Sequence, residues 1–531
     1  MKKKISPKNK DYHENILPQI ENLKRNDLIN SYLGNKGYTI YKISLNNNII
    51  EFIKKELTVK PFMQGSIAEA QAFPIYMESE KKIYVPRFWG ICIFGNPKSI
   101  KISFGKTINL KFNGQLRDYQ ERVMDSYLKA IKLGKNEEEN SEGSGLIELY
   151  AGGGKTCLAL KIIEQIKKKT LILVHKTFLK NQWVERIKQF LPDAKIGTIQ
   201  GQIIDIEDKD IVIGMIQSIS MKSYPDNIFD DFGFCIIDET HHISSQTFSN
   251  CLRKCTTLYS LGLSATMNRK DGLTPVFKMY LGEICNTISK KKDQDDVLVK
   301  AIDYVVLDDE EHNSEDRDFR GNLKYSTMLS KVSKLNFRCD FIINVIENEL
   351  KINKNQQIIL LGHQKNLLNY IFKGVEAKNI TSVGYYVGGM KDKDLKISET
   401  KQLILATYAM AAEALDIPSL TTLILATPKS DIVQSVGRIL RTKHEHPLII
   451  DIIDQHDCFL NQFNKRKIFY NQNKYKIIRT NNDKYVNYIK YIRGGLEFDE
   501  TLIWKEIIPK NRGKNKNNES ENENKCLIKL N

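Results

Sequence analysis

The sequence LYAGGGKT at residues 149–156 places three consecutive glycines between an apolar stretch and an amphipathic one. The residues LIELY at 146–150 have the composition of a buried strand, and apolar residues recur at helical spacing from Leu158 to Ile166. Glycine adopts positive φ values and permits close approach of other groups to the backbone. A strand that turns through glycines into a helix begins a βαβ unit, so this region predicts a parallel sheet covered by helices.

Helix and strand signals alternate along most of the remaining chain. Apolar residues at helical spacing between Val123 and Ile131 predict a helix before the glycine run. After that run, strands are predicted at LILVH, DIVIGM and FCIID, and beyond residue 331 at QIILLG, KQLILAT, LTTLILAT and PLIIDI. Two successive sets of this kind predict two tandem parallel-sheet domains.

Changes in composition suggest where these domains begin and end. The first residues contain the β-like runs IYVPRF and ICIFG, charge-dense segments surround IDYVVL, and the C-terminal residues are too polar to bury a core. The predicted units are an N-terminal β-containing accessory module at 1–110, a first domain at 111–290, a charged linker region at 291–330, a second domain at 331–457, a C-terminal closing segment at 458–509 and a disordered tail at 510–531.

Several classes of protein are disfavoured. The longest apolar runs, such as LIIDII at 448–453, are far shorter than the ~20 residues of a membrane span. The basic N-terminus lacks the apolar core of a secretory signal, and nine cysteines without a CxxC pair suit a reducing compartment. We expect a soluble intracellular protein with no membrane partner. Its net charge of +16 is equally consistent with a polyanionic partner and with a lysine-rich composition unrelated to binding.

The glycine run and the two residues after it suggest phosphate binding. Backbone amides of the loop and the following helix N-terminus would face an anion, Lys155 would reach the β- and γ-phosphates, and the Thr156 hydroxyl would complete a Mg²⁺ shell. A plain glycine-rich turn is the alternative, because Leu149 stands where a strict phosphate loop has its first glycine. The residues predicted to form the cradle are Gly152, Gly153 and Gly154.

A second feature, CIIDETHH at 235–242, places two acids at the end of an apolar strand. Ligands of open α/β sheets gather at the carboxyl ends of the strands. Adjacent buried acids need a positive partner, and Mg²⁺ is the natural one beside a phosphate loop. Asp238 would hold the metal and Glu239 would orient or deprotonate the attacking water. The alternative, a solvated turn after a strand, is disfavoured by the presence of both features in one chain.

These segments resemble the motifs of superfamily 2 helicases, over roughly residues 110–480. DETH at 238–241 stands in place of the DEAH form of motif II, and in these enzymes motif I often lacks its first glycine. LRDYQ at 116–120 resembles the adenine-reading segment, SAT in LGLSATMNRKDG resembles motif III, ATYAMAAEALDIP at 406–418 resembles motif V, and QSVGRILR at 434–441 resembles motif VI.

The match extends to the XPB-like branch, and particularly to transcript-release type DNA helicases of poxviruses and other large DNA viruses. The segments that carry it are VHKTFLKNQWVERI, NRKDG, TPKSDIVQSVGRILR and, in the accessory module, IYVPRFWGICIFG. The stretch NQFNKRKIFYNQNKYKI at 461–477 is also similar. Its lysines and aromatic residues are equally consistent with nucleic-acid contact and with an ordinary closing helix.

The resemblance implies two RecA-like domains that bind ATP and Mg²⁺ between them, with hydrolysis driving domain movement. It assigns catalysis to Lys155, Asp238, Glu239, Arg438 and Arg441, and recognition of the adenine edge to Gln120. It assigns coupling between nucleotide state and movement to His241, Ser264, Ala265, Thr266, Asp416, Gln434 and Gly437. Nucleic acid is expected to contact His175, Lys176, Gln217, Ser218 and Thr407.

Three functions remain open at this point. The first is an ATP-driven DNA helicase or translocase in viral transcription or replication, with the transcription machinery as a partner and the host cytoplasm or virion as its location. The second is the same motor acting on RNA. The third is a catalytically silent nucleic-acid clamp, which the complete set of motif residues disfavours. Binding to nucleic acid is expected to be sequence-tolerant and salt-sensitive.

Overall fold

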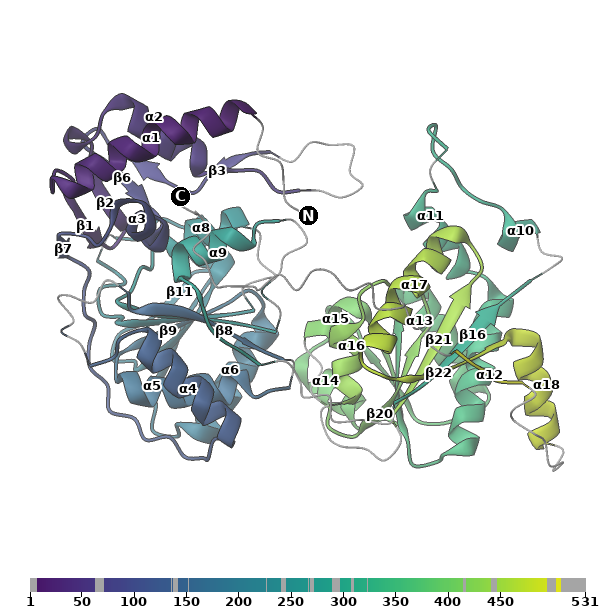
Figure 1. Cartoon of the computed structure of the whole chain (residues 1–531). Coiled ribbons are helices and arrows are strands. Elements are labelled where there is room, and N and C mark those ends of the chain that lie inside the picture. The colour runs from purple at the N-terminus through teal and green to yellow at the C-terminus, as the bar shows by residue number, and fades with distance from the viewer. Residues whose placement is uncertain are drawn as a thin grey trace. The chain divides into compact units, whose positions relative to one another are not determined.

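The computed structural model forms two compact units, unit 1 from Met1 to Lys290 and unit 2 from Lys291 to Asn522. The structure describes residues 7–62, 71–134, 136, 142–150, 152–225, 227–239, 245–265, 267, 272–288, 297–306, 310–321, 323–413, 417–440, 447–493 and 503–507. Both units combine a large sheet with helices on its faces (Figure 1). Each unit is described by itself.

The accessory module of unit 1 contains a five-stranded sheet in the order β5-β6-β2-β1-β7. Its inward side chains and the helices form one apolar core, which includes Tyr38, Ile40, Ile83 and Phe52. The strands are β1 (Ser31–Gly34), β2 (Gly37–Tyr41), β5 (Met77–Glu78), β6 (Lys82–Val85) and β7 (Ser99–Ile100), with a separate pair β3 (Thr58–Val59) and β4 (Phe73–Pro74). The helices are α1 (Pro7–Arg25), η1 (Lys42–Ser44), α2 (Asn47–Glu56) and α3 (Arg87–Phe94).

The run ICIFG at 91–95, read from the sequence as β-like, is mostly helical and lies in α3. Pro86 directly precedes this helix and Gly95, with φ of 84°, ends it. Pro86 and Gly95 stand at helix-boundary positions that suit proline and glycine. The prediction of a strand was wrong because a short apolar run cannot distinguish a buried strand from a buried helix by its periodicity.

The first parallel-sheet domain has eight strands in the order β11-β10-β12-β9-β13-β14-β8-β15. Seven of these strands run parallel, and β11 pairs antiparallel with β10 at one edge. The strands are β8 (Ser144–Leu149), β9 (Thr170–Val174), β10 (Ile196–Gln200), β11 (Ile203–Asp205), β12 (Ile211–Met215), β13 (Phe234–Asp238), β14 (Tyr259–Ser264) and β15 (Ile284–Ile288). This arrangement confirms the fold class predicted from the alternating pattern.

Two helical layers cover this sheet, because alternate residues of each strand point to opposite faces (Figure 1). In β9, Ile172 and Val174 join the core beneath α4, α5 and α6, while Leu171 and Leu173 join the core beneath α7, α8 and α9. These helices are α4 (Asp118–Ala130), α5 (Lys155–Ile166), α6 (Thr177–Phe190), α7 (Ile216–Met221), α8 (Ser245–Leu252) and α9 (Thr274–Leu281).

The accessory module packs directly on this domain. Leu273 and Val276, from α9 and the residue before it, belong to the apolar core of the module. The buried guanidinium of Arg87 donates hydrogen bonds from Nη1 to the carbonyls of Thr257 and Leu258, at 3.3 and 2.9 Å. Burial lowers the pKa of Arg87 to about 10, so it stays charged at neutral pH. The module and the domain therefore form one compact unit.

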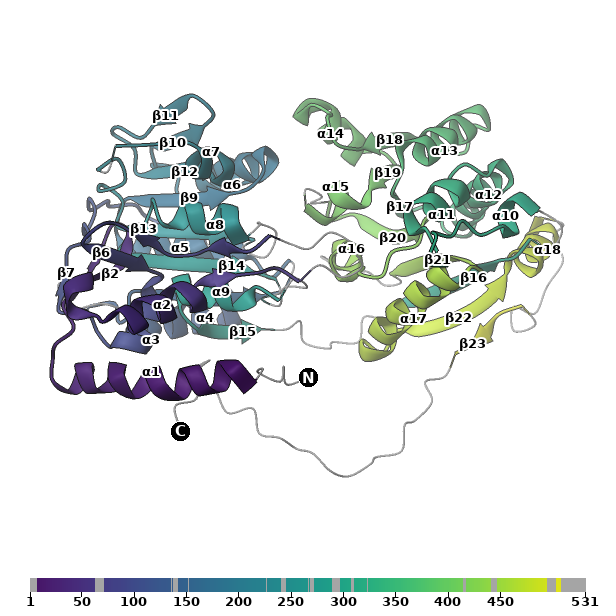
Figure 2. The same ribbon diagram turned by 90° about the horizontal axis from the view of Figure 1, so that it is seen from above.

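Unit 2 contains a second eight-stranded sheet, in the order β18-β19-β17-β20-β21-β16-β22-β23, and its strands can be followed in this order in Figure 2. Its strands are β16 (Leu298–Tyr304), β17 (Gln357–Gly362), β18 (Val383–Tyr386), β19 (Leu403–Thr407), β20 (Leu420–Leu425), β21 (Leu448–Asp454), β22 (Lys476–Asn481) and β23 (Lys505–Glu506). Its helices are α10 (Glu310–Asn313), α11 (Tyr325–Val332), α12 (Asn336–Ile352), α13 (Lys365–Ala377), α14 (Asp392–Glu399), α15 (Tyr408–Glu413), α16 (Val433–Ile439), α17 (Asp457–Gln472) and α18 (Asn482–Arg493).

The region at 291–330, expected to be a charged linker, contributes an interior strand to this sheet. β16 pairs in parallel with β21 on one side and with β22 on the other. Its side chains Val299, Ala301 and Ile302 are fully buried. The linker prediction was therefore wrong for residues 298–304. It rested on the charge-dense segments on both sides, and the apolar run between them is short.

Residues 461–477 belong mainly to α17, and the structure favours the closing-helix interpretation for this stretch. Phe463 and Tyr470 are buried, and so is Arg466 between them. Arg466 donates from Nε and Nη2 to both carboxylate oxygens of Asp451, at 2.8 and 2.9 Å. These side chains attach α17 to β21. The tail at 510–531 lies outside the described residues.

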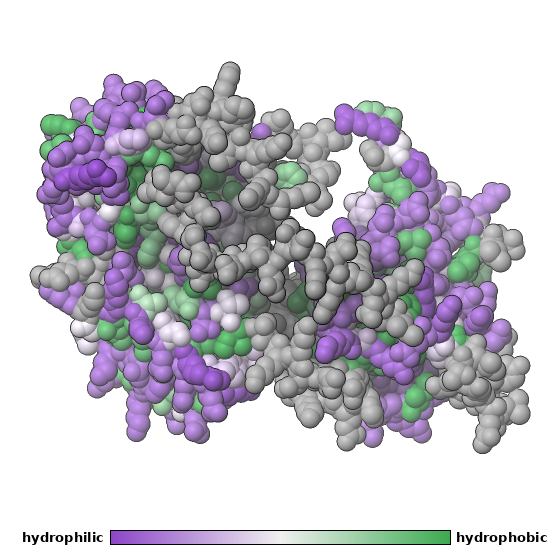
Figure 3. Space-filling model, viewed as in Figure 1, coloured by the Kyte–Doolittle hydropathy of each residue, from purple (hydrophilic) through white to green (hydrophobic). Residues whose placement is uncertain are grey.

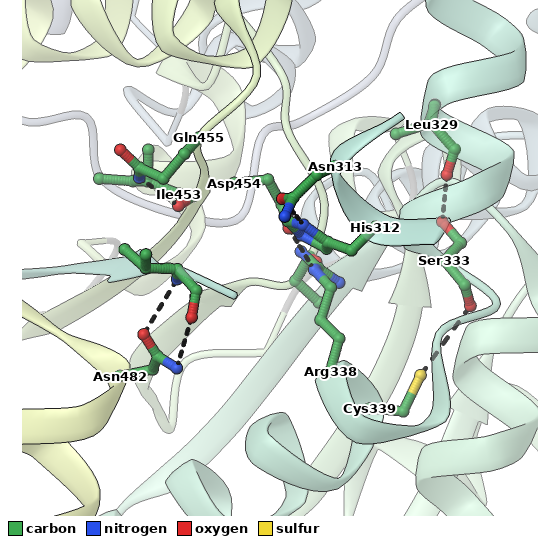
Figure 4. A network of polar contacts seen from close by, with 12 residues as sticks. His312, Asn313, Leu329, Ser333, Arg338, Cys339, Ile453, Asp454, Gln455 and Asn482 are labelled. Carbon is green, nitrogen blue, oxygen red and sulfur yellow. Dashed lines mark hydrogen bonds and ion pairs between the residues drawn. The ribbon is translucent and has the colours of Figure 1, made fainter. Parts of the chain in front are cut away.

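A second buried ion pair holds α12 against the sheet (Figure 4). Arg338 donates from Nε and Nη2 to the two oxygens of Asp454, at 2.6 and 2.8 Å, and both side chains are fully buried.

The face seen in Figure 3 carries mostly hydrophilic side chains over both units, with scattered apolar ones. Among the described helices, none combines the length and the apolar character required to cross a membrane.

Candidate active site

The glycine run forms a tight loop between β8 and α5. Gly152 and Gly154 have φ values of 83° and 74°, in the left-handed region that favours glycine. A Cβ on Gly153 would lie 2.8 Å from Cγ of Leu149, and one on Gly154 would lie 2.4 Å from Nε2 of Gln120. The loop therefore has no room for side chains on its inner glycines, as a backbone cradle for an anion requires.

Gln120 supports this loop from the start of α4. Its Nε2 donates to the carbonyls of Gly153 and Gly154 at 3.1 and 3.3 Å, while its Oε1 accepts from the backbone N–H of Arg117 at 2.9 Å. Tyr119 adds a hydrogen bond from its hydroxyl to the Gly153 carbonyl at 3.0 Å. Recognition of an adenine edge by Gln120 remains a prediction, and the observed contacts show a role in positioning the loop.

Lys155 and Glu239 meet across the carboxyl edge of the sheet. Lys155 begins α5, and its Nζ lies 2.5 Å from Oε1 of Glu239. Glu239 follows the last residue of β13 with φ of 49°, an unusual value for a residue with a side chain. Backbone strain of this kind is concentrated at functional sites. The structure thus brings together the two charged residues that the sequence motifs singled out separately.

Asp238 is buried beside this pair at the end of β13, with 8% of its surface exposed. Oδ2 of Asp238 accepts a hydrogen bond from Nε1 of Trp183 at 2.9 Å. Burial, together with the nearby charge of Glu239, raises the pKa of Asp238 to about 6. The ionised form would be stabilised by a divalent cation, so the site fits Mg²⁺ with the hydroxyl of Thr156 as the other predicted protein ligand.

Trp183 was not among the residues predicted from the sequence. It lies within VHKTFLKNQWVERI, a segment that resembles the viral branch and that also contains His175 and Lys176. Its position on the buried face of α6 is that of an ordinary core residue, and its side chain is 1% exposed. Only the packing of α6 over β9, the neighbour of β13, aims the indole N–H at a carboxylate, so no local sequence signal could have identified the contact.

β14 lies between β8 and β13 and carries the start of the SAT segment. Leu263 is in register with Asp238 on one side, and Ser264 is in register with Glu148 on the other. Ser264 is fully buried, and Ala265 follows it at the same edge of the sheet. These residues therefore stand between the glycine loop and the acids, the position from which a coupling element would contact both.

Four residues predicted to contact nucleic acid lie at neighbouring strand ends. His175 and Lys176 follow β9, while Gln217 and Ser218 belong to α7, which follows the adjacent strand β12. Gln217 donates from Nε2 to the His175 carbonyl at 3.0 Å, and the Ser218 hydroxyl accepts from the backbone N–H of Gly201 at 3.0 Å. Thr407 ends β19 in unit 2. Nucleic-acid contact by these residues remains a prediction.

The remaining predicted residues are only partly covered by the structure. Gln434, Gly437 and Arg438 lie in α16, and the structure describes the backbone but not the side chains of Gln434 and Arg438. The residues His241, Thr266, Asp416 and Arg441 lie outside the described residues.

The arrangement has the chemical parts needed to bind and hydrolyse a nucleoside triphosphate. The glycine loop and the N-terminus of α5 present backbone amides and a lysine, which suit a phosphate chain. The adjacent acids suit a metal ion and a water molecule. The ammonium of Lys155 is paired with the carboxylate of Glu239, and phosphate oxygens would compete for the same ammonium.

Comparison with known proteins identifies the family. Residues 113–269 match the family described as "Type III restriction enzyme, res subunit". The putative ATP-dependent RNA helicase L396 of Acanthamoeba polyphaga mimivirus is 34% identical over 462 residues, which cover 83% of this chain and 85% of that protein. The putative helicase 161L of Invertebrate iridescent virus 6 is 26% identical, over 68% of this chain and 81% of its own.

A third relative is the putative ATP-dependent RNA helicase QP509L of African swine fever virus, isolate Pig/Kenya/KEN-50/1950, which is 24% identical over 68% of this chain and 74% of its own. The mimivirus similarity spans both units, and the matched family segment contains the glycine loop and both acids. The chain therefore belongs to the superfamily 2 helicases, is related to those of large DNA viruses, and is a nucleic-acid-dependent ATPase of the helicase class.

Proposed function

We propose that this protein is an ATP-driven DNA translocase or helicase whose hydrolytic centre is formed by Lys155, Asp238 and Glu239. The observation that carries the proposal is the 2.5 Å contact between Lys155 and Glu239, beside the buried Asp238. A lysine and two acids at the edge of a parallel sheet, next to a glycine loop, match the requirements of phosphoryl transfer to water.

Each residue has a distinct role in this proposal. Lys155 leaves Glu239 for the β- and γ-phosphates, and Glu239 then orients or deprotonates the attacking water. Asp238 and Thr156 would hold Mg²⁺, which would supply positive charge against the phosphate oxygens. Trp183 keeps the carboxylate of Asp238 oriented and favours its ionised form.

Unit 2 contributes Arg438 and Arg441 in this proposal, as the family resemblance implies. A guanidinium near the γ-phosphate stabilises charge that develops in the transition state. The variant Arg441→Ala should therefore reduce the turnover number much more than it weakens nucleotide binding. Equal losses in both quantities would remove the proposed catalytic role of Arg441.

DNA is the proposed track, contacted mainly through its phosphates by His175, Lys176, Gln217, Ser218 and Thr407. Such contacts position the protein without reading sequence. Similarity to helicases of large DNA viruses supports a role in viral transcription or replication, with the transcription machinery as a partner and the host cytoplasm or virion as the location. Affinity should fall steeply as salt increases.

RNA is the second candidate track. It is favoured by the names of the mimivirus and African swine fever virus relatives, both of which are described as putative ATP-dependent RNA helicases. The predicted phosphate contacts do not discriminate, because phosphates are common to both nucleic acids.

The test compares ATP hydrolysis with no nucleic acid, with single-stranded DNA, with duplex DNA and with RNA of the same sequence. The proposal predicts stronger stimulation by DNA, and Lys155→Ala should abolish it. Stimulation by RNA alone would assign the protein to RNA. Absence of hydrolysis under every condition, by a protein that still binds nucleic acid, would indicate a silent clamp.

A further inference from the structure

The sheet of the accessory module has one apolar face and one face that is aromatic and basic. Tyr38, Ile40 and Ile83 point into the core, so the alternating residues point to the other face. Cross-strand pairing aligns these as one row, Met77, Tyr84, Thr39, Tyr32 and Ser99. Tyr41 and Lys82 are paired beside the row on the same face.

Lysine side chains lie over the tyrosine rings of this face. Nζ of Lys101 is 4.7 Å from the ring centroid of Tyr32, and Nζ of Lys82 is 5.2 Å from the same centroid and 4.9 Å from that of Tyr41. Nζ of Lys36 is 5.9 Å from the centroid of Tyr84. Flat rings and ammonium groups are therefore interleaved at the spacing of cation–π contacts.

This face forms one wall of an open cavity of about 640 Å³, and the first parallel-sheet domain forms the other. The cavity lies within unit 1, where α3 and Arg87 fix the module on the domain. Its lining includes four basic residues, Lys36, Lys101, Arg253 and Lys254, and none of the described lining residues is acidic. Asp230, in an adjoining cavity, accepts a hydrogen bond from Asn35 at 2.8 Å.

The basic residues of the cavity divide into two groups. Nζ of Lys254 donates hydrogen bonds of 2.7 to 2.9 Å to the carbonyls of Ile219, Ser220 and Lys222, and these bonds hold the C-terminal end of α7. Arg253 donates from Nη1 to the Tyr76 carbonyl at 3.1 Å and so joins the two walls.

The second group consists of Lys36 and Lys101, which are exposed in the cavity. Their ammonium groups lie beside aromatic rings that are only partly buried. They are therefore suited to pairing with an anionic ligand, whereas Arg253 and Lys254 build the walls.

We propose that this cavity, called here the module groove, binds a single strand of DNA outside the motor's own contacts. The choice of DNA rests on the proposed function above. Bases of a single strand can stack on the rings of Tyr32 and Tyr84 once the ammonium groups of Lys101 and Lys36 turn from these rings to the phosphates. A duplex does not offer this combination, because its base faces are stacked internally.

The position of α7 gives the strand a route into the module groove. Gln217 and Ser218, predicted to contact nucleic acid, lie in the first turn of α7, and Ser220 in its last turn lines the groove. A strand that follows the carboxyl edge of the sheet to α7 would therefore reach the groove along one short helix. The module would then lengthen the binding site of the motor.

The test measures binding of a fluorescent oligothymidylate of about 12 nucleotides, a length within the range of known single-strand sites, to the full chain by anisotropy. Tyr32→Ala and Lys101→Glu should each weaken binding at least ~5-fold. Lys55→Glu is the matched control for Lys101→Glu. It makes the same charge change at an exposed position of α2, which covers the apolar face of the sheet, and it should leave the affinity within about 2-fold.

The thermal unfolding midpoint should be unchanged in both groove variants, which verifies that they are folded. Affinity for oligothymidylate that is unchanged in both variants would overturn the proposal. An equal loss with Lys55→Glu would also overturn it by showing a general charge effect. The proposal would also be overturned if duplex DNA or polyglutamate displaced the labelled oligothymidylate as effectively as unlabelled single-stranded DNA does. It would likewise be overturned if the variants changed the binding of RNA alone.

These experiments distinguish a failure of the groove proposal from a failure of the proposed DNA motor. If RNA alone stimulates hydrolysis while oligothymidylate binding depends on Tyr32 and Lys101, the proposed DNA motor fails and the groove stands. If DNA stimulates hydrolysis and the two variants bind oligothymidylate normally, the groove fails and the motor stands.

Discussion

Trp183 and Asp238, 55 positions apart, are joined by a hydrogen bond of 2.9 Å from the indole Nε1 to the carboxylate Oδ2. The two residues come from neighbouring βα units. α6 follows β9, and β9 pairs directly with β13, which ends at Asp238. A donor to the carboxylate favours its ionised form, and this opposes the effect of burial on the pKa of Asp238.

Replacing this donor should weaken metal binding. Trp183→Phe keeps an aromatic ring but removes the N–H, so the pKa of Asp238 should rise above its value of about 6 and less of the carboxylate should be ionised at neutral pH. We expect the Mg²⁺ concentration for half-maximal ATP hydrolysis to increase about 10-fold. A titration of activity against Mg²⁺ at saturating ATP measures the change.

Phe190→Leu is the control for this substitution. Phe190 ends the same helix, and its ring stacks on Phe112 at 5.4 Å between centroids, away from the acids. It should reduce stability without altering the Mg²⁺ dependence. If Trp183→Phe also leaves that dependence unchanged, the indole N–H has no role in metal binding.

The loop glycines allow a prediction that separates backbone strain from steric exclusion. Gly154→Ala places a Cβ 2.4 Å from Nε2 of Gln120 at φ of 74°, so both the loop and its support must move. Gly134→Ala imposes a similar strain at φ of 90°, but no atom lies within 4 Å of its Cβ. Gly134→Ala should lose about 1 to 2 kcal/mol of stability through strain alone, Gly154→Ala should lose more, and only Gly154→Ala should lose ATP binding.

Binding of a fluorescent ATP analogue, together with thermal unfolding, distinguishes these effects. Normal nucleotide affinity in Gly154→Ala would show that the observed loop shape is not required for binding.

The contact between Lys155 and Glu239 predicts opposite behaviour for two variants. Lys155→Ala should lose nucleotide affinity, because it removes a charge that meets the phosphates. Glu239→Gln should bind ATP at least as well as the unaltered protein, because Lys155 is no longer held by a carboxylate, yet turnover should fall at least ~100-fold. Equilibrium binding and single-turnover hydrolysis separate the two quantities. Normal turnover in Glu239→Gln would eliminate the proposed role in water activation.

Much of the parallel-sheet architecture could be predicted from residue patterns. FCIID at 234–238 coincides with β13, because β-branched and apolar residues end abruptly at charged ones. QIILLG at 357–362 likewise coincides with β17. Buried parallel strands read as continuous apolar runs, and this makes their ends distinct in the sequence. The approach of Lys155 to Glu239 then follows, because both lie at the carboxyl edge of one sheet.

Other features depend on contacts between segments that are distant in the sequence. α3 was mistaken for a strand because five apolar residues fit either structure, and its packing against α9 decides the outcome. β16 is short and has charged flanks, and its interior position is set by pairing with β21 and β22. Trp183 is inconspicuous for the same reason, since its role depends on a neighbouring βα unit.

The buried pair of Arg338 and Asp454 predicts a large effect on the stability of unit 2. Arg338→Met leaves the Asp454 carboxylate uncompensated in the interior, which costs about 3 to 5 kcal/mol. The double variant Arg338→Met, Asp454→Leu should recover most of this loss because no buried charge remains. Hydrogen exchange of peptides from α12 and β21 measures the change in the full chain.

The matched control for this pair is Arg479 with Asp303. It has a similar two-bond geometry, at 2.8 and 2.7 Å, but the Arg479 side chain is 34% exposed. Arg479→Met should cost at most about 1 kcal/mol because solvent screens the remaining charge. Equal losses for the two arginines would show that burial is not what makes the first pair important.

His363, directly after β17, predicts how the stability of unit 2 depends on pH. Burial, aided by the charge of Lys429, lowers the pKa of His363 to about 4, and its Nδ1 lies 2.8 Å from the Thr427 hydroxyl. The folded chain keeps this imidazole neutral where the unfolded chain, with a histidine pKa of about 6.5, takes up a proton. Stability is therefore complete above about pH 6.5 and declines as pH falls towards about 4.

The variant His363→Gln should remove about 1 kcal/mol of the stability lost between roughly pH 7.5 and pH 5, a figure reduced for the partial exposure of the ring. Thermal midpoints of the full chain at the two pH values measure it. The burial of His456 also lowers its pKa, so His456→Gln should remove a separate share of the acid sensitivity. Identical pH profiles for the unaltered protein and His363→Gln would show that this imidazole titrates equally in the folded and unfolded chain.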